Sequence, residues 1–179
     1  MEAKTHVLLV EENVEFVDQV RHHLQGAASG SIELKSVSRV ASGMEKLAGE
    51  GCDVVLLDLS MPNSAGLDTF HHLYDNELDK PPIFVLAEAE DETTAVQAVR
   101  EGAEDYLIKP MIDQHNLVRA IRYAIERSRR RKAEHALRHT EYEIRIARQI
   151  QESLLPCNPP QLEGVDLAGA SLPAEVVSG

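Results

Sequence analysis

Four charged residues stand at the ends of short apolar segments: the pair Glu11-Glu12, Asp58 and Lys109; their types suit chemistry at one shared site. Carboxylates that lie close together repel one another strongly unless a cation neutralises them. Oxygen ligands favour a hard ion, and magnesium, which keeps several waters, fits best. A lysine opposite them could stabilise a transferring phosphoryl group. Asp58 would then be the nucleophile and form an aspartyl phosphate.

The apolar segments before these residues have the pattern of buried strands. They are Val7–Val10, Val54–Leu57 and Tyr106–Ile108. Short continuous apolar runs bounded by turn residues are typical of strands covered on both faces, as in a parallel sheet. Open α/β sheets bind ligands beyond the carboxyl ends of their strands. The pattern therefore predicts that the charged residues converge at one edge of a sheet.

Two further strands are expected at Ile32–Val37 and Ile83–Leu86, and segments of helical spacing follow every strand. Five strand-then-helix units alternate over about 120 residues. Such alternation indicates an α/β fold, a doubly wound five-stranded parallel sheet with right-handed crossovers and helices on both faces.

A long C-terminal helix is expected because neither Pro nor Gly occurs from Asp113 to Leu155. We predict a domain over 1–126, a helical coiled-coil linker over 127–155, and a segment over 156–179 without an independent fold. The linker pattern favours a parallel homodimer over a lone solvated helix. The residues at heptad-like spacing are Ala133, Leu137, Thr140, Ile144, Ala147, Gln151 and Leu154.

Charge and composition exclude several classes of function. Residues 1–126 carry 10 Lys and Arg against 23 Asp and Glu, which argues against nucleic acid as a partner. The basic run Arg127–Lys132 is read as an exposed helix face. Cys52 and Cys157 lie outside any metal-ligand spacing. With no leader and no long apolar run, we expect a soluble, cytoplasmic protein that does not enter a membrane.

About the first 125 positions resemble the receiver domain of two-component response regulators, of the chemotaxis-regulator kind. The family fold has the strand order 2-1-3-4-5. The resemblance rests on the pair Glu11-Glu12, on Asp58-Leu-Ser60-Met61-Pro62 with Gly66, and on Gly102-Ala-Glu-Asp-Tyr106-Leu-Ile-Lys109-Pro110.

The resemblance implies a role for each matching residue. Asp58 would accept a phosphoryl group from a sensor histidine kinase or phosphotransfer protein. Magnesium would be held by the acidic pair, chiefly Glu12, with Asp58 and the backbone carbonyl of Ser60. Lys109 would contact the phosphoryl group. At the switch, Tyr106 would change rotamer, and the bond before Pro110 would be a cis peptide.

Two positions depart from the family pattern. Family members usually carry Asp where Glu12 stands, and the extra methylene moves the carboxylate by about 1.5 Å. The Ser or Thr that normally contacts the phosphoryl group is Ala87, followed by Glu88. Without that hydroxyl, the usual conformational response should be weak or differently coupled.

The end of the chain resembles the entry to sporulation-type serine/threonine phosphatases of the PPM superfamily. The matching segments are Ile146–Pro156, Pro159-Pro160, Gly164–Gly169 and Pro173-Ala174. In that family the first metal-binding aspartate comes next, after Gly179. We therefore expect this chain itself not to be an enzyme, although its parent protein could carry a phosphatase effector.

Two hypotheses follow. The first is a response regulator that is phosphorylated on Asp58 with magnesium and signals through a dimeric helix to a phosphatase effector. The alternative is a degenerate, non-phosphorylated receiver that acts as a constitutive dimerisation or partner-docking module. Ala87 and Glu12 favour the alternative, whereas Asp58, Lys109 and Tyr106 favour the first.

Overall fold

The structure is a computed structural model that describes residues 4–26, 32–49, 51–61, 64–74, 80–154 and 164. The segment expected to begin the phosphatase, 156–179, lies outside these residues except for Gly164, as do Pro62 and Leu155. Contacts between residues divide the chain into two units, Met1–Arg130 and Arg131–Gly179.

A five-stranded sheet in which every neighbouring pair is parallel forms the centre of the first unit. Its order is β2-β1-β3-β6-β7. Because β6 and β7 are the fourth and fifth strands of this sheet, the predicted α/β fold and strand order are confirmed. The strands are β1 (Thr5–Val10), β2 (Ile32–Val37), β3 (Val54–Asp58), β6 (Ile83–Ala87) and β7 (Asp105–Ile108).

A small antiparallel pair, β4 (Ser60–Met61) with β5 (Ser64–Ala65), follows β3 and lies outside the main sheet. Gly66 directly follows β5, and its backbone N–H donates to the carbonyl of Leu59 at 2.8 Å. Its φ of 62° is a conformation that glycine adopts without steric cost. The chain after Asp58 therefore returns at Gly66 to the end of β3.

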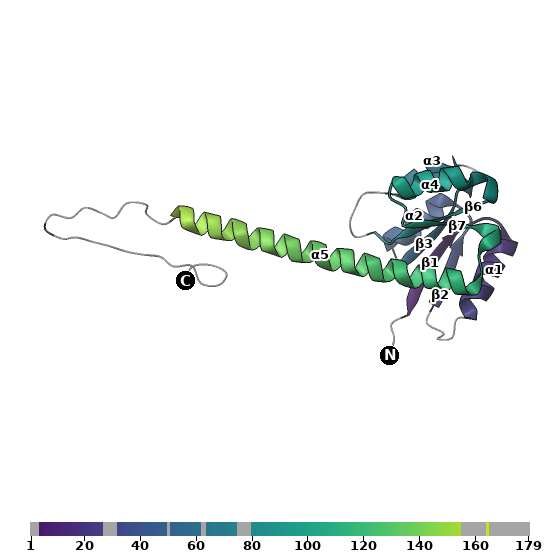
Figure 1. Cartoon of the computed structure of the whole chain (residues 1–179), viewed down its shortest axis with the longest axis horizontal. Helices are drawn as coiled ribbons and strands as arrows, with labels where there is room; N and C mark the ends of the chain where they lie inside the picture. The colour runs from purple at the N-terminus through teal and green to yellow at the C-terminus, as the bar shows by residue number, and fades with distance from the viewer. Residues whose placement is uncertain are drawn as a thin grey trace. The chain divides into compact units, whose positions relative to one another are not determined.

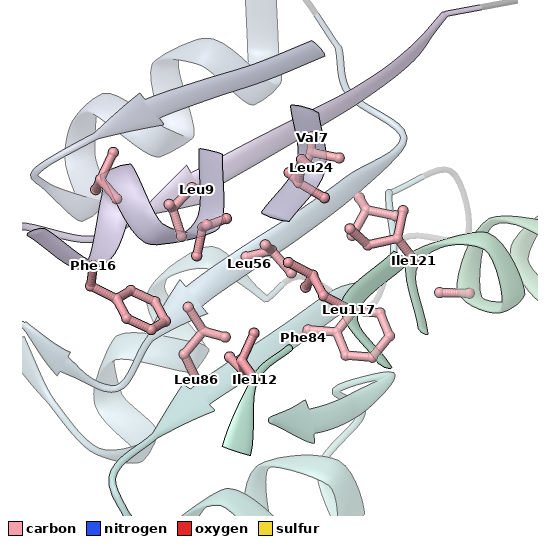
Figure 2. Packing of buried hydrophobic residues seen from close by; sticks show 14 of the residues in the cluster. Val7, Leu9, Phe16, Leu24, Leu56, Phe84, Leu86, Ile112, Leu117 and Ile121 are labelled. Carbon is pink, nitrogen blue, oxygen red and sulfur yellow. The ribbon is translucent and has the colours of Figure 1, made fainter. Parts of the chain in front are cut away.

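Helices cover both faces of the sheet (Figure 1). On one face, Leu9, Leu56 and Phe84 pack with Phe16 and Leu117, as Figure 2 shows. The second, third and fourth helices along the chain cover the opposite face of the sheet. The helices are α1 (Val14–Gln25), α2 (Val40–Gly49), α3 (Leu67–Leu73), α4 (Glu92–Arg100) and α5 (Gln114–Leu154), with short 3₁₀ turns η1 (Ala89–Asp91) and η2 (Lys109–Met111). With both faces covered, the carboxyl edge of the sheet remains for a site.

Helix α5 is the long helix that the absence of Pro and Gly predicts. Its first turns carry Leu117 and Ile121, which are fully buried in the core of the first unit. Farther along, Leu137 is 62% exposed. The coiled coil over 127–155 stays a prediction. Within the described residues, no helix is long and apolar enough to cross a membrane.

Candidate functional site

The carboxyl ends of four strands bring the predicted site residues to one edge of the sheet. Asp58 and Ala87 are the last residues of β3 and β6. Glu11 follows β1, and its backbone N–H extends the ladder by donating to the carbonyl of Val37 at 2.9 Å. Lys109 follows β7, which pairs with β6.

Lys109 links the two buried carboxylates. Its Nζ lies 2.8 Å from Glu11 Oε2 and 3.0 Å from Asp58 Oδ1. The side chains of Lys109, Glu11 and Asp58 are only 10%, 1% and 3% exposed. The ammonium also lies 5.0 Å from the centre of the Phe16 ring. A buried charge cluster of this kind is held by mutual pairing, because each charge alone is costly to desolvate.

The pKa values of Lys109 and Glu11 depend on two opposing influences, burial of the side chains and their pairing with opposite charges. Burial lowers the pKa of Lys109, but the hydrogen bond with Glu11 and the charge of Asp58 outweigh it, so the net shift is upward. Burial is the largest influence on Glu11 and raises its pKa, although hydrogen bonds with Lys109 and the Asn13 backbone oppose the shift. Lys109 is therefore firmly protonated at neutral pH.

Asn13 fixes the position of Glu11. Its backbone N–H donates to Glu11 Oε1 at 2.9 Å. Its side-chain oxygen accepts from the backbone N–H groups of Glu15 and Phe16, which caps α1. Both oxygens of the Glu11 carboxylate are therefore held, because Oε2 lies 2.8 Å from Lys109 Nζ.

The predicted magnesium ligands are only partly brought together. Glu11 and Asp58 are adjacent to Lys109, whereas the Glu12 side chain is exposed. The Ser60 backbone N–H donates to Asp58 Oδ1 at 3.2 Å, so Ser60 also lies at the site. Among the residues described, no three His, Cys, Asp or Glu side chains are grouped as metal ligands.

Ala87 is fully buried at the end of β6 and offers no hydroxyl. The next residue, Glu88, places Oε1 3.8 Å from Lys109 Nζ. Residue types mark Glu88 only as a departure from the family pattern, and they do not place Glu88, Phe16 or Asn13 at the site. Glu88 directly follows Ala87, and Asn13 and Phe16 come shortly after Glu11. This closeness in sequence to predicted site residues is the signal that could have indicated them.

Tyr106 and Pro110 complete the predicted set. The Tyr106 hydroxyl donates to Glu92 Oε1 of α4 at 2.8 Å, and this hydrogen bond raises the pKa of Tyr106. The predicted cis peptide before Pro110 is wrong, because the described residues include no cis peptide bond. Pro110 lies at the start of η2, where the fixed φ of a trans proline suits the first turn.

Comparison with known proteins identifies the family. The response regulator receiver domain matches residues 7–122. The regulatory protein AtoC of Escherichia coli is 35% identical over 120 residues, which cover 66% of this chain and 25% of AtoC. The luminescence regulatory protein LuxO of Vibrio campbellii is 37% identical over 79 residues, covering 44% of this chain and 17% of LuxO. The chain thus spans less than half the length of the curated relatives that it matches.

A solved structure has the same fold. The receiver domain of the sensor histidine kinase PA1611 from Pseudomonas aeruginosa, with a magnesium ion coordinated in its active-site cleft, aligns with a TM-score of 0.58 and 22% identity. The alignment covers 69% of this chain and 99% of that domain. The receiver-domain match over residues 7–122, more than half of the chain, shows that the chain belongs to the response regulator receiver domain family and contains the receiver domain of a two-component response regulator.

Proposed function

We propose that Asp58 accepts a phosphoryl group from a sensor histidine kinase or phosphotransfer protein in the cytoplasm. The observation that carries this proposal is the buried contact of Lys109 with Asp58 and Glu11 at the carboxyl edge of the sheet. The ammonium fixes the orientation of Asp58 and lies where it could contact incoming phosphoryl oxygens.

In the proposed transfer, a carboxylate oxygen of Asp58 attacks the phosphorus of a phosphohistidine. The new P–O bond forms as the P–N bond breaks, and the imidazole leaves with the electron pair. Lys109 then shifts from the Asp58 oxygen toward a phosphoryl oxygen, while its contact with Glu11 keeps it at the site.

The residues present suit a magnesium ion in their chemistry. Glu11 and Asp58 offer carboxylate oxygens, and the Ser60 backbone carbonyl belongs to the same donor class. Glu11 Oε2 and Asp58 Oδ1 already contact the Lys109 ammonium, so a magnesium ion would share these buried carboxylates with it. Glu12, which is exposed, would be a further ligand from the rim. When bound, magnesium would neutralise charge on the transferring group.

Two exposed apolar side chains that are close in sequence to site residues support docking of a protein partner. Val14, which begins α1, is 70% exposed, and Met111 in η2 is 72% exposed. Both follow site residues closely along the chain, Val14 after Glu11 and Met111 after Lys109. Apolar residues flanking a polar centre are typical of a surface that another protein covers.

We further propose that the signal leaves through a parallel dimer over 127–155 and reaches a C-terminal phosphatase effector that begins within 156–179. The exposed Leu137 and the absence of Pro and Gly in α5 support this arrangement. The chain itself would not be an enzyme.

Ala87 favours a second candidate, a receiver that is not phosphorylated and docks or dimerises constitutively. Without a hydroxyl on β6, the site lacks one donor for a phosphoryl oxygen.

The two candidates are separated by intact-mass spectrometry after incubation with acetyl phosphate and magnesium. The first predicts a gain of one phosphoryl group that is absent from the Asp58→Asn variant and lost in mild base. A folded dimer without any mass gain would support the constitutive module instead.

A further inference from the structure

Glu88 occupies an unusual place at the edge of the site. It precedes η1 with extended backbone angles, φ −74° and ψ 163°, and its side chain makes no capping hydrogen bond. Instead its carboxylate lies on the side of Lys109, with 3.8 Å between Oε1 and Nζ. The side chain is 43% exposed, so it can move without disturbing the core.

Lys109 has three N–H donors, and carboxylates surround it. Glu11 and Asp58 take the two close contacts, and Glu88 is the third anion within 4 Å. These three carboxylates carry three negative charges against one positive charge. The ammonium is thus shared before any phosphoryl group arrives.

Phosphorylation of Asp58 would add negative charge at the same place. The phosphoryl oxygens would need the ammonium, and the buried Ala87 offers them no hydroxyl. Glu88 would then repel the phosphoryl group and compete with it for Lys109. At this distance the competition acts across a partly solvated gap, so salt screens it.

We propose that Glu88 is a positioning residue that competes with the phosphoryl group for Lys109 and so limits phosphorylation of Asp58. This inference rests on the proposed phosphoryl acceptance. It makes the receiver selective for strong donors: a docked phosphoprotein offsets the repulsion through its own contacts, whereas a small free phosphodonor reacts more slowly.

The test compares the wild-type chain with Glu88→Gln, which keeps the size of the side chain and removes its charge. The matched control is Glu90→Gln, which removes one charge from an exposed residue of η1 in the same segment. Acetyl phosphate is the donor: Asp58 attacks phosphorus and acetate leaves with the electron pair. The initial rate of phosphorylation is followed by intact mass, and the binding of beryllium fluoride with magnesium is titrated separately.

We expect Glu88→Gln to raise both the rate and the beryllium fluoride affinity about fivefold, the effect of one charge at roughly 4 Å under water-like screening. Glu90→Gln should change either quantity less than about twofold. The advantage of Glu88→Gln should shrink as ionic strength rises from about 0.01 M to about 1 M. A merely structural role would not give this salt dependence.

Equal behaviour of Glu88→Gln and the wild type, or an increase matched by Glu90→Gln, would overturn the inference while leaving phosphoryl acceptance intact. A complete lack of phosphorylation in every variant, with circular dichroism showing folded protein, would overturn both proposals together.

Discussion

Replacing Lys109 with Met should destabilise the receiver strongly. Met preserves much of the length and apolar character of the lysine stem while removing the ammonium. Glu11 and Asp58 are then left as two buried carboxylates without their shared counterion. The fold should lose stability because like charges that are poorly solvated repel one another.

The magnitude follows from how deeply the cluster is buried. The exposed fraction of the Glu11 and Asp58 side chains is 1% and 3%. Removing one partner of such a pair costs about 3–5 kcal/mol in the free energy of unfolding. For a domain of this size, that loss corresponds to a decrease in Tm of about 10–20 °C.

The loss should depend on pH in a defined direction. Without Lys109, the pKa of Glu11, already raised by burial, should rise further above its ordinary value of 4.5. A carboxyl pKa raised by folding lowers stability as pH rises from the unfolded value through the folded one. The deficit of Lys109→Met relative to wild type should therefore be largest at neutral pH and smallest below about pH 4.5.

Urea unfolding followed by circular dichroism across this pH range provides the assay. Lys4→Met is the matched control, because Lys4 pairs with Glu33 at 3.8 Å on the surface and should contribute less than about 1 kcal/mol. Adding Asp58→Asn to Lys109→Met should restore part of the loss by removing one carboxylate. A deficit below about 1 kcal/mol, or one unchanged by pH, would refute the account of the cluster.

Three further predictions concern other parts of the chain. Burial raises the pKa of Cys52 to about 12. In a Cys157→Ser background at pH 8, iodoacetamide should therefore alkylate Cys52 more than about 100-fold more slowly in the folded protein than in the urea-unfolded protein. Similar rates in the two states would contradict the burial of Cys52. Asn13→Ala should cost about 1 kcal/mol in urea unfolding through loss of the α1 cap, and Asn13→Ser should recover most of it; a neutral Asn13→Ala would rule out the capping role. Leu137→Glu should convert the proposed dimer to a monomer in sedimentation velocity without changing the thermal unfolding of the receiver; an unchanged dimer would place the contact elsewhere.

The positions of Asp58 and Lys109 could be predicted from sequence because buried parallel strands are continuous apolar runs with sharp ends. Once five such runs alternate with helical segments, the topology places their carboxyl ends together. The same reasoning predicts α5, since a long segment free of Pro and Gly has few alternatives.

Which member of the acidic pair enters the site could not be read from residue type. Glu11 is buried because its backbone continues the ladder of β1 beside Val37, which directs its side chain toward Lys109. Glu12 is one residue farther along, so it faces solvent. The small β4–β5 pair was also missed, because strands of two residues carry no periodic signal.

The contact between Glu88 and Lys109 is a tertiary feature that joins the ends of β6 and β7. Residue type indicates a charge after Ala87, but its direction depends on the backbone angles before η1. The trans bond before Pro110 likewise depends on the turn that follows, a local geometry that the family resemblance did not supply.

The most direct test of phosphoryl acceptance is to map the modified residue. After incubation with acetyl phosphate and magnesium, borohydride reduction converts an aspartyl phosphate to homoserine, which peptide mass spectrometry locates. We expect homoserine at position 58, and none there when acetyl phosphate is omitted. Homoserine at another aspartate, or at none while the protein remains folded, would contradict the assignment of Asp58 as the phosphoryl acceptor.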